Sequence, residues 1–106
     1  MKNKIIVQKM LGYCDSIREY TADFNYNQFE NNKMIVEACV FNLLQMGELI
    51  SKFDGEFTES NQQIPWKLIR GLRHRLVHDY EGVDLTLVWE IITNDLPELQ
   101  ISLKNL

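Results

Sequence analysis

One segment of the sequence collects residues that could act on a phosphate. Between positions 65 and 78 there is no acidic residue, but there are four basic side chains and both histidines of the chain: Lys67, Arg70, Arg73, His74, Arg75 and His78. An imidazole can move protons at neutral pH, and a guanidinium can hold a phosphate through paired hydrogen bonds. The combination suits general acid–base chemistry on a phosphodiester, with arginine stabilising charge on the phosphate.

The net charge of the chain at first argues against a nucleic-acid partner. The 106 residues contain 11 Lys+Arg and 15 Asp+Glu, for a formal net charge of −4, whereas nucleic-acid-binding domains are usually basic. However, the segment from 65 to 78 carries four cations and no acid, which leaves −8 on the rest of the chain. An acidic protein with one basic stripe can still make a local contact with a polyanion.

The basic residues fall unevenly around a helix. On a straight helix with 100° per residue, Lys67, Arg70, His74 and His78 share one polar stripe. Arg73 falls inside the apolar arc, where a guanidinium is costly unless it snorkels, is paired or opens into a cleft. Since Arg73 and His78 would lie about 140° apart, we expect either a helix distorted near its end or a site completed by a second copy.

Helical periodicity predicts the elements that position these residues. A first helix of about five turns carries an apolar stripe with four- and three-residue steps: Ile6, Met10, Tyr13, Ile17 and Tyr20. Residues 23–32 form a loop or a short helix. A second helix, from about Met34 to Phe53, is apolar around most of its circumference and should be the most buried one. Gly47 in its interior would let a neighbouring helix approach closely.

The second half of the chain continues the helical pattern. Residues 54–63 are polar and predict a connecting loop, and Pro65 suits the first turn of a third helix that ends near Gly82. Asp84 is a candidate N-cap for a last helix. Pro97 either kinks that helix or lies in the first turn of a new one capped by Asp95. The sequence therefore predicts one all-α domain over residues 1–106, an up-and-down bundle of four to five helices.

Composition also bounds the compartment and the chemistry. The longest uncharged, mostly apolar run, Ala38 to Gly47, is shorter than the about 20 residues of a membrane span, and no signal peptide is readable. We expect a cytoplasmic protein in which Cys14 and Cys39 are reduced core thiols. The sequence has no paired Cys/His motif, and a structural zinc site is therefore not expected.

The basic segment carries a resemblance to a known family. Its R-x4-H followed by D-Y, Arg73-His74-Arg75-Leu76-Val77-His78-Asp79-Tyr80, resembles the signature of the HEPN superfamily, and more narrowly that of the HepT-like toxins found beside a minimal nucleotidyltransferase antitoxin. The surrounding IPWKLIRGLRHRLVHDYEGVDLTLVWEIITNDLPEL is similar to the C-terminal half of that family. Residues 39–51 resemble its central helix, so the likeness covers roughly two thirds of the chain.

The resemblance implies a HEPN-like fold and a homodimeric, metal-independent endoribonuclease without a cofactor. Arg73 and His78 would be its active pair, and the 2′-hydroxyl of the RNA would cleave the strand and leave a cyclic phosphate. Tyr80 matches the tyrosine to which the antitoxin adds AMP groups, whose phosphates would block the groove and repel RNA. His74 stands where the family often has a small polar residue, and we expect it to support orientation or phosphate contact.

The residues leave other interpretations open. Lys67 and Arg70 are expected to steer RNA, although they could be a solvated helix face, and His78 could simply interact with the helix dipole. The chain could instead be a non-catalytic helical module that binds nucleotide or protein as partner of a nucleotidyltransferase. Less favoured is a metal-binding bundle that uses His74 and His78 at i, i+4.

Overall fold

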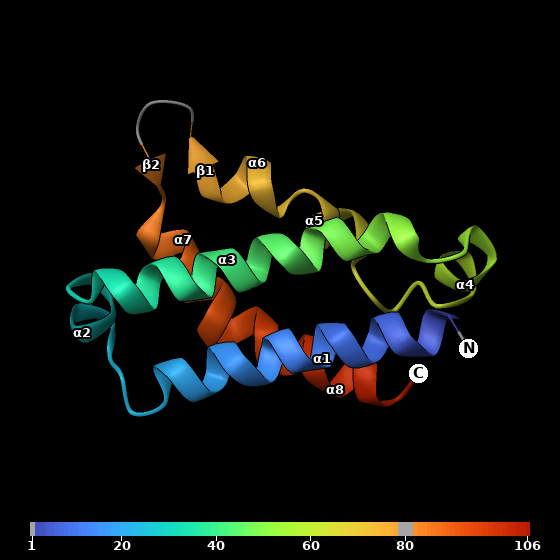
Figure 1. Cartoon of the computed structure of the whole chain (residues 1–106), viewed down its shortest axis with the longest axis horizontal. Helices are drawn as coiled ribbons and strands as arrows, with labels where there is room; N and C mark the ends of the chain where they lie inside the picture. The colour runs from blue at the N-terminus through green and yellow to red at the C-terminus, as the bar shows by residue number, and fades with distance from the viewer. Residues whose placement is uncertain (1, 79–81) are drawn as a thin grey trace.

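The computed structural model describes residues 2–78 and 82–106, and it is a bundle of helices with one short hairpin (Figure 1). The elements follow in the order α1 (Lys2–Thr21), α2 (Tyr26–Glu30), α3 (Lys33–Leu49), η1 (Ile50–Lys52), α4 (Gly55–Ser60), α5 (Trp66–Arg70), α6 (Leu72–Leu76), β1 (Val77–His78), β2 (Gly82–Val83), α7 (Leu85–Glu90), the π-helical turn η2 (Ile91–Asp95) and α8 (Leu96–Lys104). The predicted all-α fold class is confirmed.

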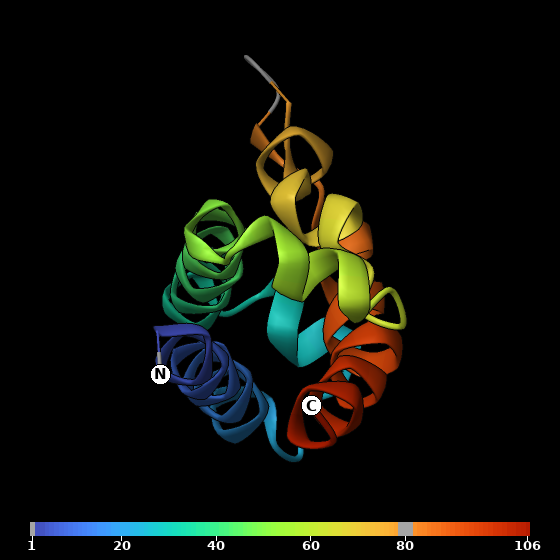
Figure 2. The ribbon, with the colours of Figure 1, turned by 90° about the vertical axis from the view of Figure 1, so that its right-hand side faces the viewer.

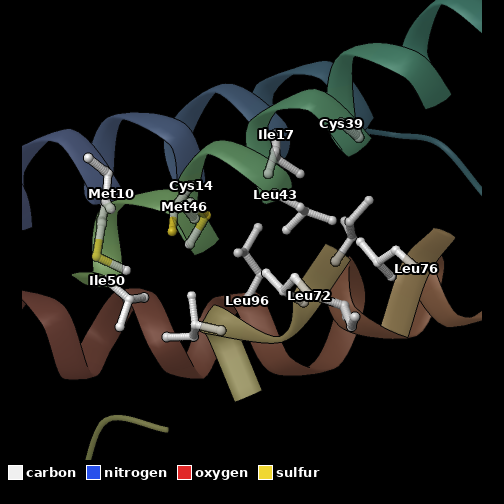
Figure 3. Packing of buried hydrophobic residues seen from close by; sticks show 14 of the residues in the cluster. Met10, Cys14, Ile17, Cys39, Leu43, Met46, Ile50, Leu72, Leu76 and Leu96 are labelled. Carbon is white, nitrogen blue, oxygen red and sulfur yellow. The ribbon is translucent and has the colours of Figure 1, made fainter. Parts of the chain in front are cut away.

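Helix α3 is the centre of the bundle, as its composition predicts. It packs along α1 on one side and against α5 and α6 on the other. Figure 3 shows Leu43 and Met46 of α3 between the buried side chains of α1 and those of α6 and α8. By length and composition Lys33–Lys52 could cross a membrane, but in this structure many of its apolar side chains are buried in the core of the bundle.

The predicted stripe on α1 is confirmed in its central part. Ile6, Met10 and Ile17 are buried, and Tyr13 is half-buried against the core. Tyr20 is exposed, so the stripe ends one turn earlier than the periodicity predicts. Thr21, the next residue, is buried in its place, and the exposed tyrosine can keep its hydroxyl in water.

Both cysteines lie in the core, as predicted. Cys14 on α1 and Cys39 on α3 are free thiols with no exposed surface. Burial, which disfavours the charged thiolate, raises the pKa of each thiol to about 12. Both are therefore protonated, unreactive packing groups at neutral pH.

Gly47 allows the close helix contact that its position predicts. A Cβ at this position would lie 2.9 Å from the carbonyl oxygen of Ile69 on α5. Real Cβ atoms essentially never come this close to another heavy atom. Glycine at position 47 thus fixes how near α5 can lie to α3.

The predicted third helix is wrong in its length and continuity. It divides at Gly71, whose backbone nitrogen donates to the carbonyl of Lys67 at 3.0 Å and closes α5. Pro65 precedes the helix as its N-cap and does not lie in the first turn. Glycine is a poor helix former, so the divided segment continues as the separate one-turn helix α6.

The chain leaves the helical conformation after Leu76, well before Gly82. Val77 is extended and pairs with Val83 in an antiparallel register that also pairs His78 with Gly82. The backbone nitrogen of Asp84 donates to the carbonyl of Leu76 at 3.0 Å and closes the hairpin. Gly82 has a φ of 83°, a conformation that glycine adopts without strain. In Figure 2, α6 and the two short strands project from one side of the bundle.

The two polar connections contain short helices. Residues 26–30 form α2, one of the two predicted alternatives, and Asn25 and Gln28 cap it through a reciprocal pair of hydrogen bonds. Residues 54–63, predicted as a loop, contain α4. No residue of α4 is buried, and therefore its sequence carries no apolar periodicity.

The end of the chain combines a confirmed and a wrong prediction. Asp84 caps α7, since its carboxylate accepts a hydrogen bond from the backbone of Leu87 at 3.1 Å. Pro97 lies in the first turn of α8, one of the two predicted alternatives, but Asp95 has helical backbone angles and its side chain makes no cap hydrogen bond. The π-helical turn η2 ends at Asp95, two residues before Pro97, and a proline in the first turn of α8 has no α-helical hydrogen bond to lose.

Candidate functional site

Helices α5 and α6 position the basic residues because each is anchored by its apolar side. Trp66, Ile69, Leu72 and Leu76 are all buried in the core. The indole nitrogen of Trp66 donates to the backbone carbonyls of Thr58 and Asn61 at 3.1 and 3.0 Å. Trp66 also packs against Phe53 and Phe57. The sequence-based interpretation of Trp66 as a core anchor is confirmed.

The opposite side of these two helices carries free positive charge. The side chains of Lys67, Arg70, Arg73 and His74 are exposed. Within the described part of the chain, none of these four takes part in an ion pair, since the two pairs found there are Lys2–Asp54 and Lys33–Glu37. A run of unpaired cations on one surface attracts an anionic partner.

The predicted position of Arg73 on the apolar side of the helix is wrong. The helical wheel places it in the apolar arc, but its side chain is exposed. The wheel assumes one straight helix, whereas the chain divides at Gly71 and starts a new turn at Leu72. The guanidinium therefore needs no buried partner and is accessible to a ligand.

The second active-site candidate lies beyond the helix. His78 is in β1, where its backbone is paired with Gly82. The predicted angle of 140° from Arg73 does not apply, because residues 77 and 78 are extended. Of the two expectations, a helix that is distorted near its end is confirmed, and completion by a second copy stays a prediction. Tyr80 lies outside the described residues.

The helical basis of the metal alternative is also wrong. His74 and His78 would share one face of a helix at i, i+4, but α6 ends at Leu76. In residues 2–78 and 82–106, no group of three or more His, Cys, Asp or Glu side chains is arranged to hold a metal ion.

Arg75 does not join the exposed basic face. It is half-buried and lines a cleft of about 300 Å3. The other wall of that cleft carries Asp95 and Glu98. The basic residues of this segment therefore do not form one surface. Arg75 lines the cleft that Asp95 and Glu98 also line, whereas Lys67, Arg70, Arg73 and His74 are exposed.

Sequence reasoning missed a surface depression next to the basic residues. It is lined by Thr58 and Gln62 together with Pro65, Lys67, Leu68 and Arg70 of the α5 segment. The missed signal is Asp54 before Gly55-Glu56-Phe57-Thr58, since Asp is a favoured N-cap residue. Asp54 does stand at the N-cap of α4, but its carboxylate accepts hydrogen bonds from Lys2 and Asn3 and not from the helix backbone.

Comparison with known proteins includes the segment that carries these residues. The family model described as "Ribonuclease HepT-like" matches residues 10–106, a range that includes α5, α6 and the hairpin strands. The chain belongs to the HepT-like ribonuclease family. As a member of this family it is a ribonuclease, and RNA is its substrate.

Named relatives cover nearly the whole chain. A candidate RNase of Methanocaldococcus jannaschii is 36% identical over 97 residues, which cover 92% of this chain and 89% of the relative. A candidate RNase of Caldanaerobacter subterraneus is 30% identical over 94% of this chain and 89% of its own length. A ribonuclease HepT assigned in Thermococcus cleftensis is 29% identical over 79% of this chain and 76% of its own length. No solved structure matches the chain significantly.

Proposed function

We propose that this ribonuclease is the toxin of a toxin–antitoxin pair in the cytoplasm, and that Arg73 and His78 cleave RNA at a groove between two copies of the chain. One observation carries the catalytic assignment. Arg73 projects from the one-turn helix α6 as an exposed cation without an ion pair among the described residues, and His78 follows directly in β1. The family match covers this segment.

The proposed chemistry uses the substrate's own nucleophile. His78 takes the proton from the ribose 2′-hydroxyl, and the 2′-oxygen attacks the adjacent phosphorus. Arg73 stabilises the charge that gathers on the phosphate oxygens in the transition state. The bond to the 5′-oxygen breaks, that oxygen takes up a proton, and the upstream strand ends in a cyclic phosphate. No metal ion takes part in these steps.

The other exposed residues have supporting roles in this proposal. His74 adjoins Arg73 on α6 and contacts the phosphate or orients it. Lys67 and Arg70 on α5 hold the strand through its phosphates, the usual source of affinity for nucleic acids. Their charge also steers RNA toward the site despite the acidic remainder of the chain.

RNA cleavage by single-residue variants tests the catalytic pair. We expect Arg73→Ala and His78→Ala to lose at least about a hundredfold in rate, while Lys104→Ala, an exposed change on α8, cleaves like the wild type. The cleaved strands should end in a cyclic phosphate and form in the presence of a chelator. Equal RNA decay in all four proteins would overturn the assignment, and activity that a chelator abolishes would favour a metal mechanism.

Regulation by the antitoxin is the second part of the proposal. A minimal nucleotidyltransferase would add AMP groups to Tyr80, two residues from His78, and their phosphates would repel RNA. Intact mass after co-expression with the neighbouring transferase should show AMP-sized increments that are absent from Tyr80→Phe. The proposal fails if no increments form, or if Tyr80→Phe still gains them.

A further inference from the structure

The surface between α4 and α5 is hollowed at the start of α5. This α4–α5 groove has a volume of about 380 Å3 and is lined by Thr58, Gln62, Pro65, Lys67, Leu68 and Arg70, among others. Its walls are held together by Trp66, whose indole nitrogen donates to the carbonyl of Thr58 at 3.1 Å. The side chain of Gln62 donates to the same carbonyl at 2.9 Å. The groove is therefore a built feature of the fold.

The chemistry of the α4–α5 groove fits a single nucleic-acid strand. Lys67 and Arg70 are exposed and form no ion pair with any described residue. Between them in the sequence, Leu68 leaves 55% of its surface exposed. Cations that follow the phosphates beside an apolar surface for bases or sugars are the features of grooves that bind single strands.

The groove and the proposed cleavage site lie along the same pair of successive helices. Lys67 and Arg70 line the groove from α5, and Arg73 follows on α6 beyond the division at Gly71. A strand bound at the groove can therefore continue along this exposed basic face toward Arg73.

We propose that the α4–α5 groove binds a stretch of single-stranded RNA beyond the nucleotides that react at Arg73 and His78. The inference deepens the proposed function and rests on it for the position of the cleaved bond. The groove adds affinity for RNA beyond the reacting nucleotides, through two phosphate contacts and one apolar contact.

Salt dependence of binding tests the two phosphate contacts. The His78→Ala protein is expected to leave RNA intact, and a fluorescent 12-nucleotide oligouridylate is titrated with it between about 50 and 400 mM salt. Each phosphate contact to a single strand contributes about −0.7 to the slope of log K against log salt. Adding Lys67→Ala and Arg70→Ala to the His78→Ala protein should therefore make this slope less negative by about 1.4.

A matched pair of charge changes serves as the control. Lys9→Ala/Lys104→Ala removes two exposed lysines from α1 and α8, which lie on the other side of the bundle (Figure 1). This pair should leave the slope unchanged. If both pairs change the slope equally, RNA senses only the net charge of the protein and the inference is overturned.

The apolar contact is tested without any change in charge. Leu68→Ala removes an exposed side chain, so the fold is expected to persist, and it should weaken oligouridylate binding about fivefold, the effect of losing some 40 Å2 of apolar contact. The salt slope should stay the same. Unchanged affinity of Leu68→Ala would contradict a groove that holds bases or sugars.

The same proteins separate the two proposals. The groove is measured by binding to the His78→Ala protein, whereas the catalytic pair is measured by cleavage with His78 in place. Loss of slope in Lys67→Ala/Arg70→Ala together with undiminished cleavage by Arg73→Ala would support the groove and reject the catalytic pair. The reverse pattern would retain the catalytic pair and reject the groove.

Discussion

Gly47 of α3 lies so close to Ile69 of α5 that a Cβ on the glycine would be 2.9 Å from the isoleucine carbonyl oxygen. The contacting atom belongs to the backbone, so it can move only if α5 moves. We predict that Gly47→Ala lowers the free energy of unfolding by up to roughly 2 kcal/mol, because overpacking usually costs roughly 1–3 kcal/mol. The gain in helix propensity, about 1 kcal/mol, offsets only part of that cost. Urea denaturation followed by circular dichroism measures the change.

Gly12 provides the matched control for this prediction. It lies exposed within α1, and nothing is found within 4 Å of a Cβ built there. Gly12→Ala should therefore stabilise the protein by up to about 1 kcal/mol. If the two alanine variants gain stability alike, the close approach of α5 to α3 is not a constraint on this fold.

The buried thiols predict how stability depends on pH. The pKa of Cys14 and of Cys39 is about 12 in the folded protein, against 9.0 for an unperturbed thiol. Between these values the unfolded chain has lost the thiol protons and the folded chain has kept them, so stability falls as pH rises. We predict a loss of roughly 1–3 kcal/mol between pH 8 and pH 10, measured by urea denaturation.

Other groups also titrate in this range, and a variant separates them. Cys14→Ala/Cys39→Ala will be less stable at every pH because it leaves cavities in the core. Its stability should nevertheless fall less steeply between pH 8 and pH 10 than that of the wild type. Parallel pH profiles would show that ionisation of the thiols does not drive the loss.

Elements whose positions are set by the core were predictable from the sequence. The spacing of Ile6, Met10 and Ile17 places them on one face because a helix repeats every 3.6 residues, and the same argument makes α3 the central helix. Asp84 was predictable as a cap because its carboxylate acts on the backbone three residues later. In these cases the deciding interactions lie within a few residues of one another.

Elements decided by more distant contacts were not predictable. Local preference would continue the helix past Leu76, but Val77 pairs with Val83 across the hairpin. The helical wheel put Arg73 in the apolar arc and His78 on a helix face, and both placements fail because the helix divides at Gly71 and ends at Leu76. The residue types of the site could be read from the sequence and the family resemblance, while their placement required the fold.

Gly82 predicts a link between hairpin geometry and cleavage. Its φ of 83° is unfavourable for an L side chain, and its backbone pairs with that of His78. We predict that Gly82→Ala slows RNA cleavage because strain of about 1–2 kcal/mol opens this pairing. Gly82→Asn should retain most of the activity, since asparagine tolerates positive φ better. Single-turnover cleavage rates compare the two variants.

The open surroundings of Gly82 separate an effect of backbone strain from an effect of a steric clash. Nothing lies within 4 Å of a Cβ at position 82, so alanine there causes no steric clash. A slow Gly82→Ala enzyme with unchanged thermal stability of the bundle would therefore assign Gly82 a role in positioning His78. Equal rates for the alanine and asparagine variants and the wild type would show that the paired backbone does not matter for cleavage.

Mixing inactive variants tests whether two copies share one active centre. If Arg73 of one copy works with His78 of the other, a dimer formed from Arg73→Ala and His78→Ala chains contains one centre with both wild-type residues and one with neither. We predict that refolding the two variants together restores about a quarter of the wild-type activity: half of the random dimers are mixed, and each has one of its two centres active. The measurements are the cleavage rate and the molar mass by light scattering. Activity that stays at the level of the separate variants, in a solution shown to contain mixed dimers, would place Arg73 and His78 of the same chain in each centre.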